Sequence, residues 1–97
     1  MPAKLSPAAI NSALAELPGW KLADGKLHRE YKFDDFTLAF GFMAACATAI
    51  EKMNHHPEWS NVYGTVIVDL TTHDAGGVTK NDADLAATME RVAQRLL

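Results

Sequence analysis

The stretch FTLAFGFMAACATAIEKMNHHPEWSNVYGTVIVDL, residues 36–70, decides the fold because its hydrophobic period changes partway along. Residues 36–53 are apolar on nearly every side of a helical projection, which predicts one long helix. Beyond the proline that follows, residues 66–71 alternate between two faces, as a strand does. Residues 58–63 fit a partner strand that joins it through Gly64-Thr65. The stretch therefore predicts a helix followed by a hairpin.

The flanking sequence supplies a first helix, a first hairpin and a closing helix. Ser6-Pro7 begins a helix that Pro18-Gly19 ends. Alternating residues on both sides of Asp24-Gly25, a dipeptide suited to positive φ angles, predict a hairpin. Thr79 with Asp82 resembles a capping box at the start of the last helix, as Asp34 or Asp35 caps the long one. The order helix, hairpin, helix, hairpin, helix predicts an α+β fold with the helices packed on one face of the sheet.

The long helix also predicts self-association, because a helix that is apolar all round must bury more than one face. We expect one sheet to cover one side and a second copy of the chain to cover the other, near Gly41 and Ala45. A membrane span is not expected, since the run is shorter than the roughly 20 residues that a bilayer requires and acidic residues flank it. The first predicted face holds Phe36, Phe40, Met43, Ala47 and Ile50, and the second holds Leu38, Phe42, Ala45, Ala49 and Met53.

Composition narrows the class of protein. Ninety-seven residues, 48% hydrophobic and 22% charged, predict one folded domain over residues 1–97. The net charge of -3 and the absence of a Lys/Arg cluster argue against nucleic acid as a partner. Cys46 is the only cysteine and the amino terminus shows no secretion signal, so we expect a reducing, cytoplasmic location. Inside an apolar helix, Cys46 itself is expected to be a small buried side chain and not a reactive thiol.

Three of the four histidines gather at the ends of the predicted elements. His55 and His56 precede Pro57, which disfavours helical geometry at His56, so the pair lies where the helix gives way to the strand. His73 follows the last strand. Imidazole has an unperturbed pKa of about 6.5 and exchanges protons near neutral pH, so these three histidines are the predicted catalytic residues. His28 stands alone in a strand pattern and is expected to have no role in the site.

Other residues near the histidines are candidates for orienting or binding. Asp69, Asp74 and Asp82 are possible orienting partners, although each also fits a solvated charge or a helix cap. Trp59 could border a flat heterocycle, although a core tryptophan is the commoner role. The flexible turn at residues 74–77 allows the backbone to approach a planar ligand closely.

A metal site is the weaker interpretation of the same residues. A metal-dependent hydrolase would use His55, His56 and His73 with an aspartate. Adjacent histidines rarely share one ion, however, and the usual His-x-x-x-His and Cys-x-x-Cys spacings are absent. We therefore expect neither a metal nor a cofactor.

A longer motif surrounds the histidines. It consists of Glu51, the string NHHPEWSNVY at residues 54–63, the tripeptide THD at residues 72–74, Gly77 and Asp82. Together these residues resemble the pterin-4a-carbinolamine dehydratase family, and the resemblance covers the whole chain in length and order of elements. The chain departs from some relatives at Asn54, where they carry aspartate, and at Asp74-Ala75, where they carry glutamate and cysteine.

The resemblance implies a four-stranded antiparallel sheet under a layer of three helices, assembled into homodimers or homotetramers. It also implies a hydro-lyase, 4a-hydroxytetrahydrobiopterin dehydratase. Such an enzyme removes water from a 4a-hydroxytetrahydropterin to give the quinonoid dihydropterin, and so recycles the pterin. The residues expected to bind the substrate are His55, His56, Pro57, Trp59, Thr72, His73, Asp74 and Ala75.

The residue types suit this reaction. Loss of water from a carbinolamine needs one proton delivered to the departing hydroxyl and another removed from the adjacent ring nitrogen, and histidines do both. The alternative function is that of a non-catalytic oligomerising protein, a dimerisation cofactor, which the apolar helix would also serve. The histidine trio distinguishes the two, because a scaffold has no need of it.

Overall fold

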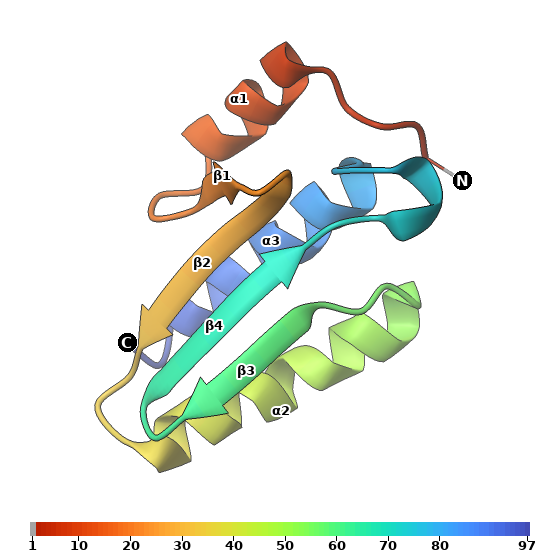
Figure 1. The fold of residues 1–97 in the computed structure, drawn as a ribbon. Coiled ribbons are helices and arrows are strands. Elements are labelled where there is room, and N and C mark those ends of the chain that lie inside the picture. Colours follow the sequence, from red (N-terminus) through yellow and green to blue (C-terminus); the bar gives the residue numbers. More distant parts are fainter. Residues whose placement is uncertain (1) are drawn as a thin grey trace.

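Four antiparallel strands and three α-helices make up the computed structural model of this chain, which describes residues 2–97 (Figure 1). The sheet has the order β1-β2-β4-β3, with every neighbouring pair antiparallel. Along the chain the elements are α1 (Pro7–Ala15), β1 (Lys21–Ala23), β2 (Lys26–Lys32), α2 (Phe36–Met53), β3 (Glu58–Val62), β4 (Thr65–Leu70), the 3-10 turn η1 (His73–Ala75) and α3 (Lys80–Gln94).

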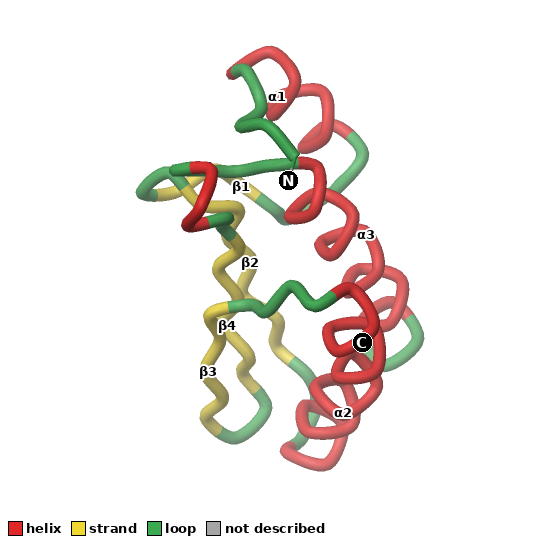
Figure 2. The backbone as a smooth tube through the Cα atoms, turned by 90° about the vertical axis from the view of Figure 1, so that its right-hand side faces the viewer, coloured by secondary structure: helices red, strands yellow, loops and turns green. Residues whose placement is uncertain are grey.

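The helices all lie on one face of the sheet, as predicted for this α+β fold (Figure 2). Strand β4 shows the reason: Val66, Val68 and Leu70 are fully buried and alternate with partly exposed residues. Leu27 and Tyr31 of β2 pair with Leu70 and Val66 and face the same side. The opposite face of the sheet carries no α-helix, and the polar residues His28, Glu58 and Asp69 lie on it.

Local signals set the element boundaries close to where the sequence predicts them. The hydroxyl of Ser6 accepts from the Ala9 N–H at 3.1 Å, and the Asp35 carboxylate accepts from the Leu38 N–H at 2.9 Å, so each caps its helix. Asp24 and Gly25 both have positive φ angles, as a two-residue hairpin turn requires.

The second hairpin turns one residue earlier than predicted. Tyr63, with φ of 50°, and Gly64 form the turn, whereas Thr65 already pairs in β4. Gly64 is required for a steric reason: a Cβ there would lie 2.4 Å from the carbonyl oxygen of Phe33. Its own carbonyl accepts from the Phe33 N–H at 2.8 Å, which fixes the hairpin against the end of β2.

The assignment of faces on α2 was wrong. The core side combines members of both predicted faces with residues from neither, namely Ala39, Phe42, Cys46 and Ile50. Phe42 is fully buried, with its ring centroid 5.0 Å from that of Tyr31, so it is a core residue. Phe36 and Phe40, by contrast, are 54% and 57% exposed. A helix that is apolar all round gives little indication of which side faces the core.

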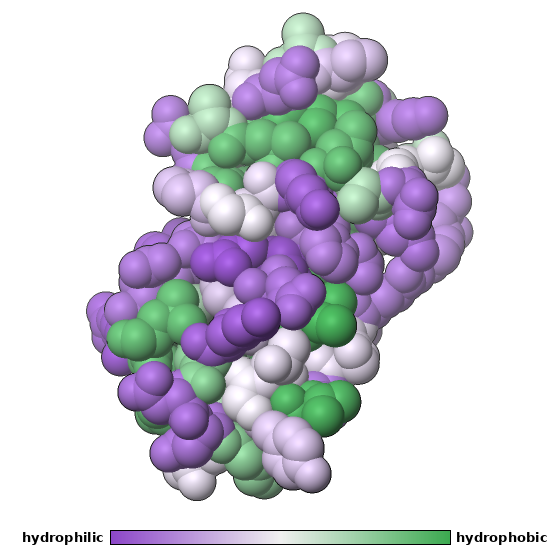
Figure 3. Space-filling model, turned by 60° about the vertical axis from the view of Figure 1, so that its left-hand side comes forward, coloured by the Kyte–Doolittle hydropathy of each residue, from purple (hydrophilic) through white to green (hydrophobic). Residues whose placement is uncertain are grey.

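The outward side of α2 leaves apolar surface uncovered in the single chain. Gly41 and Ala45 border a groove of about 430 Å³ between α2 and α3, whose other lining residues are Thr88, Arg91, Val92, Arg95 and Leu96. By length and composition α2 could also cross a membrane, but one such helix is weak evidence, because core helices pass the same test. A second apolar patch lies toward the α1 and β1 end of the molecule (Figure 3).

Candidate active site

The end of α2 directs two histidines out of the helix. Asn54 adopts the left-handed conformation, with φ of 50° and ψ of 43°, and its N–H donates to the Glu51 carbonyl. A left-handed residue at this position ends a helix and turns the chain sharply. His55 and His56 therefore lie in the short link between α2 and β3, as predicted.

The third histidine comes from the link between β4 and α3. Thr72 is buried and pairs with Gly77, which closes a small loop around η1. His73 begins this turn and is exposed, and Gly76 ends it with φ of 75°. The turn predicted after the last strand thus begins with the 3-10 turn η1.

These two links border one cavity of about 240 Å³. Its lining brings together all three histidines, although they come from sequence positions up to 18 residues apart. Of the residues predicted to bind substrate, five lie here: His55, His56, Thr72, His73 and Asp74. The lining also includes Asn54 and Thr71, which the sequence analysis did not propose as site residues.

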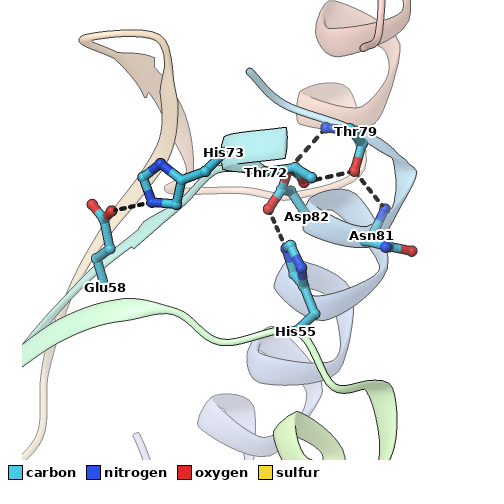
Figure 4. A network of polar contacts seen from close by, with 7 residues as sticks. All are labelled: His55, Glu58, Thr72, His73, Thr79, Asn81 and Asp82. Atoms are coloured by element: carbon cyan, nitrogen blue, oxygen red, sulfur yellow. Dashed lines mark hydrogen bonds and ion pairs between the residues drawn. The ribbon is translucent and has the colours of Figure 1, made fainter. Parts of the chain in front are cut away.

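Asp82 holds His55 in place. Its Oδ1 lies 2.6 Å from Nε2 of His55, and its side chain is fully buried (Figure 4). Its Oδ2 accepts from the Thr72 hydroxyl and from the Thr79 N–H, both at 2.8 Å. A carboxylate only accepts, so Nε2 of His55 carries the hydrogen and Nδ1 is the unprotonated nitrogen of the neutral ring.

The threonines complete this network. Thr72 donates its single hydroxyl hydrogen to Asp82, so the hydrogen between the Thr72 and Thr79 hydroxyls, 2.8 Å apart, belongs to Thr79. Thr79 in turn accepts from the Asn81 N–H at 3.3 Å. The predicted capping box of α3 is therefore present, and the same Asp82 that caps the helix also orients His55.

Glu58 of β3 is the carboxylate beside His73. Its Oε2 lies 3.1 Å from Nε2 of His73 (Figure 4). Its Oε1 lies 2.6 Å from Nζ of Lys26. The hydrogen bond from Lys26, and then the one from His73, hold the pKa of Glu58 below its usual range. The same pair raises the pKa of Lys26. Sequence spacing did not identify Glu58 as a partner, because the contact depends on how β3 lies beside the β4–η1 link.

A second cavity, of about 260 Å³, adjoins the first. His56 borders both, and the predicted residues Pro57 and Trp59 lie in this second lining with Ala47, Ile50 and Glu51. Trp59 is half-buried and packs against the core. Ala75, which was also predicted to bind substrate, lines neither cavity.

The remaining histidine and aspartates lie elsewhere or have other roles. His28 bonds through Nδ1 to Asp69 at 2.8 Å on the helix-free face of the sheet, so Asp69 is the partner of His28 and not of a site histidine. Asp74 borders the first cavity and is exposed. No cluster of three or more His, Cys, Asp or Glu side chains within residues 2–97 is arranged to hold a metal ion.

Comparison with known proteins agrees with the resemblance seen in the sequence. The model of the pterin 4 alpha carbinolamine dehydratase family matches residues 3–92. A putative pterin-4-alpha-carbinolamine dehydratase of Solibacter usitatus is 57% identical over 93 residues, which cover 96% of this chain and 98% of the relative. A protein of the same name from Rhizobium rhizogenes is 54% identical, over 95% of this chain and 93% of the relative.

A solved structure shares the fold as well. The crystal structure of a transcriptional coactivator/pterin dehydratase from Brucella melitensis matches with a TM-score of 0.89 and 46% identity, over 93% of this chain and 98% of that one. Sequence and fold therefore agree along nearly the whole chain, and the prediction of a hydro-lyase is confirmed at the level of the family. The chain belongs to the pterin 4 alpha carbinolamine dehydratase family.

Proposed function

We propose that the protein dehydrates 4a-hydroxytetrahydropterins, of which 4a-hydroxytetrahydrobiopterin is one, to quinonoid dihydropterins. The observation that carries this proposal is the cavity of about 240 Å³ bordered by His55, His56 and His73. The hydroxyl on C4a takes up a proton and leaves as water, while the adjacent N5 loses its proton and a C4a=N5 double bond forms. One acid and one base are needed, and no electrons are gained or lost.

The carboxylate partners support the acid and base roles. Asp82 and Glu58 each engage the Nε2 of one histidine, which leaves Nδ1 of His55 and of His73 as the nitrogen that exchanges a proton with substrate. Both rings can take either role, so we assign His55 and His73 as an acid–base pair whose roles exchange between substrates of opposite configuration at C4a. His56, which borders both cavities, is the third catalytic residue in this proposal.

Assembly belongs to the same proposal. The exposed Phe36 and Phe40 and the groove beside Gly41 and Ala45 favour a homodimer or homotetramer that buries the outward side of α2. This surface also favours the second candidate function, that of a dimerisation cofactor, and the Brucella melitensis protein is named both coactivator and dehydratase. We place the protein in the cytoplasm, since its single cysteine cannot form an internal disulfide and a reducing compartment suits such a chain.

The test is a dehydration assay with a synthetic 4a-hydroxytetrahydropterin, followed by its ultraviolet absorbance. The protein should accelerate formation of the quinonoid product at least tenfold over buffer, since positioned acids and bases each contribute about 10²- to 10⁴-fold. Because the mechanism uses proton transfer alone, exhaustive chelation should leave this rate unchanged. Activity that disappears with chelator and returns with one metal would replace the proposal with the metal-dependent one, and a rate equal to that in buffer would leave only the dimerisation cofactor.

A further inference from the structure

The helix-free face of the sheet carries two carboxylates in register, each beside its own imidazole. Asp69 of β4 lies opposite both His28 of β2 and Glu58 of β3. Asp69 bonds to His28 at 2.8 Å, whereas Glu58 lies 3.1 Å from His73. Glu58, and not Asp69, is therefore the carboxylate at hydrogen-bond distance from His73.

A lysine shares Glu58 with that histidine. Each carboxylate oxygen has one partner, Oε1 with Nζ of Lys26 and Oε2 with Nε2 of His73. Lys26 therefore reaches from β2 past the intervening strand β4 to β3. It lines neither of the cavities beside the histidines, and its link to His73 is the contact with Glu58.

We propose that Glu58 is a positioning residue for His73 and that Lys26, acting through Glu58, sets the pH range over which His73 exchanges protons. The inference deepens the proposed function and rests on it for its catalytic meaning. Glu58 stabilises the protonated ring and holds Nε2, so Nδ1 stays directed to other partners. The ammonium of Lys26 neutralises part of the Glu58 charge and so limits this stabilisation.

Other charged groups near His73 are occupied or differently placed. Asp82 is fully buried, and both of its carboxylate oxygens already have hydrogen-bond partners in His55, Thr72 and Thr79. Among residues 2–97, Glu58 is the only carboxylate within 4.0 Å of a ring nitrogen of His73. Glu58 of β3 contacts His73, and Asp74 of η1 and His55 and His56 of the α2–β3 link share its cavity. The other titratable groups on the surrounding elements are Lys26 and His28 of β2, Asp69 of β4 and Asp82 of α3, which contact Glu58, Asp69, His28 and His55 respectively.

The test is an NMR titration of the ring C2 proton of His73, assigned by its loss in His73→Ala. Lys26→Met should move the titration midpoint to higher pH, because Glu58 is then fully available to the protonated ring. Glu58→Gln should move the midpoint to lower pH. Two unit charges about 4 Å apart in water justify a shift of up to about 0.7 pH unit in each direction. The double variant should match Glu58→Gln alone, because Lys26 acts through the missing carboxylate.

Matched controls come from the other end of the same strand face. Lys32 and Glu30 of β2 are exposed and 4.0 Å apart, so Lys32→Met and Glu30→Gln should leave the midpoint of His73 in place.

Shifts of the same sign in Lys26→Met and Glu58→Gln, or no shift in either, would overturn the inference. The titration needs no catalysis. If the midpoints move as expected but no dehydration occurs, only the proposed function fails; if dehydration occurs and the midpoints stay, only this inference fails. If both the proposed function and this inference hold, the pH–rate profile of each variant should shift in the same direction as its His73 midpoint.

Discussion

At the scale of single residues, the carboxylate of Asp82 both caps α3 and orients His55. The sequence identifies Asp82 both as a helix cap and as a possible partner of a histidine, and its two oxygens allow both at once. Glu58 was not predicted as a partner of His73, because a contact between β3 and the β4–η1 link leaves no spacing signal in one sequence. Interactions within one segment can therefore be predicted from the spacing of residues in the sequence, whereas contacts between distant segments become visible only in the folded structure.

Asp82→Asn should lower both stability and turnover. The asparagine has one acceptor oxygen where His55, Thr72 and the Thr79 N–H require several, so at least one buried donor loses its partner at a cost of about 1–3 kcal/mol. In a domain of this size each kcal/mol lowers the Tm by about 4–8 °C. Thermal unfolding measures the loss. Asp84→Asn, at an exposed carboxylate of the same helix, is the control and should stay within about 0.5 kcal/mol; equal melting of the two variants would refute the role of Asp82.

At the scale of elements, two periodicities predicted most of the fold. The switch from an apolar helix to alternation located α2 and β4 within one residue at each end, because helix and strand place side chains on a face at different intervals. The core side of α2 was not predictable in this way. An all-round apolar helix gives nearly the same pattern whichever side is buried, so the packing of Phe42 against Tyr31 decided it.

Asn54 tests how the end of α2 presents the histidines. Its left-handed conformation is costly for an ordinary side chain, by about 1–2 kcal/mol, but not for glycine. Asn54→Ala should therefore reduce the free energy of unfolding in urea by about 1 kcal/mol, and Asn54→Gly should reduce it by less. Asn11→Ala, at an exposed position inside α1, provides the comparison and should cost nothing. If Asn54→Ala is as stable as the unmodified chain, the left-handed cap does not hold this junction.

At the scale of the whole molecule, the outward side of α2 leaves apolar side chains exposed to solvent. Its two exposed phenylalanines, 5.7 Å apart between ring centroids, adjoin solvent in the single chain. The sequence predicted this excess of apolar surface because the helix is apolar on every side. It grouped Phe42 with Ala45, near the expected contact with a second copy, whereas Phe42 belongs to the core. Self-association is the arrangement that would bury the surplus.

Light scattering should find a homodimer or homotetramer for the unmodified chain. Ala45→Glu places an unpaired charge on the proposed interface and should dissociate the assembly without unfolding the chain, since Ala45 is exposed. Ala8→Glu, at an exposed alanine of α1, should leave it assembled. A well-folded monomer of unmodified protein would contradict the proposal. Phe42→Glu does not test the assembly, because it would place a charged carboxylate in the hydrophobic core.

The central claim is that the histidine cavity is where a 4a-hydroxytetrahydropterin loses water. The most direct measurement compares the turnover of His56→Ala and His73→Ala with that of His28→Ala, which removes an imidazole that is also bonded to a carboxylate but lies outside the cavity. The first two variants should each lose at least tenfold in turnover with the fold intact, and the third should keep full activity. Full activity in His56→Ala and His73→Ala would contradict the account.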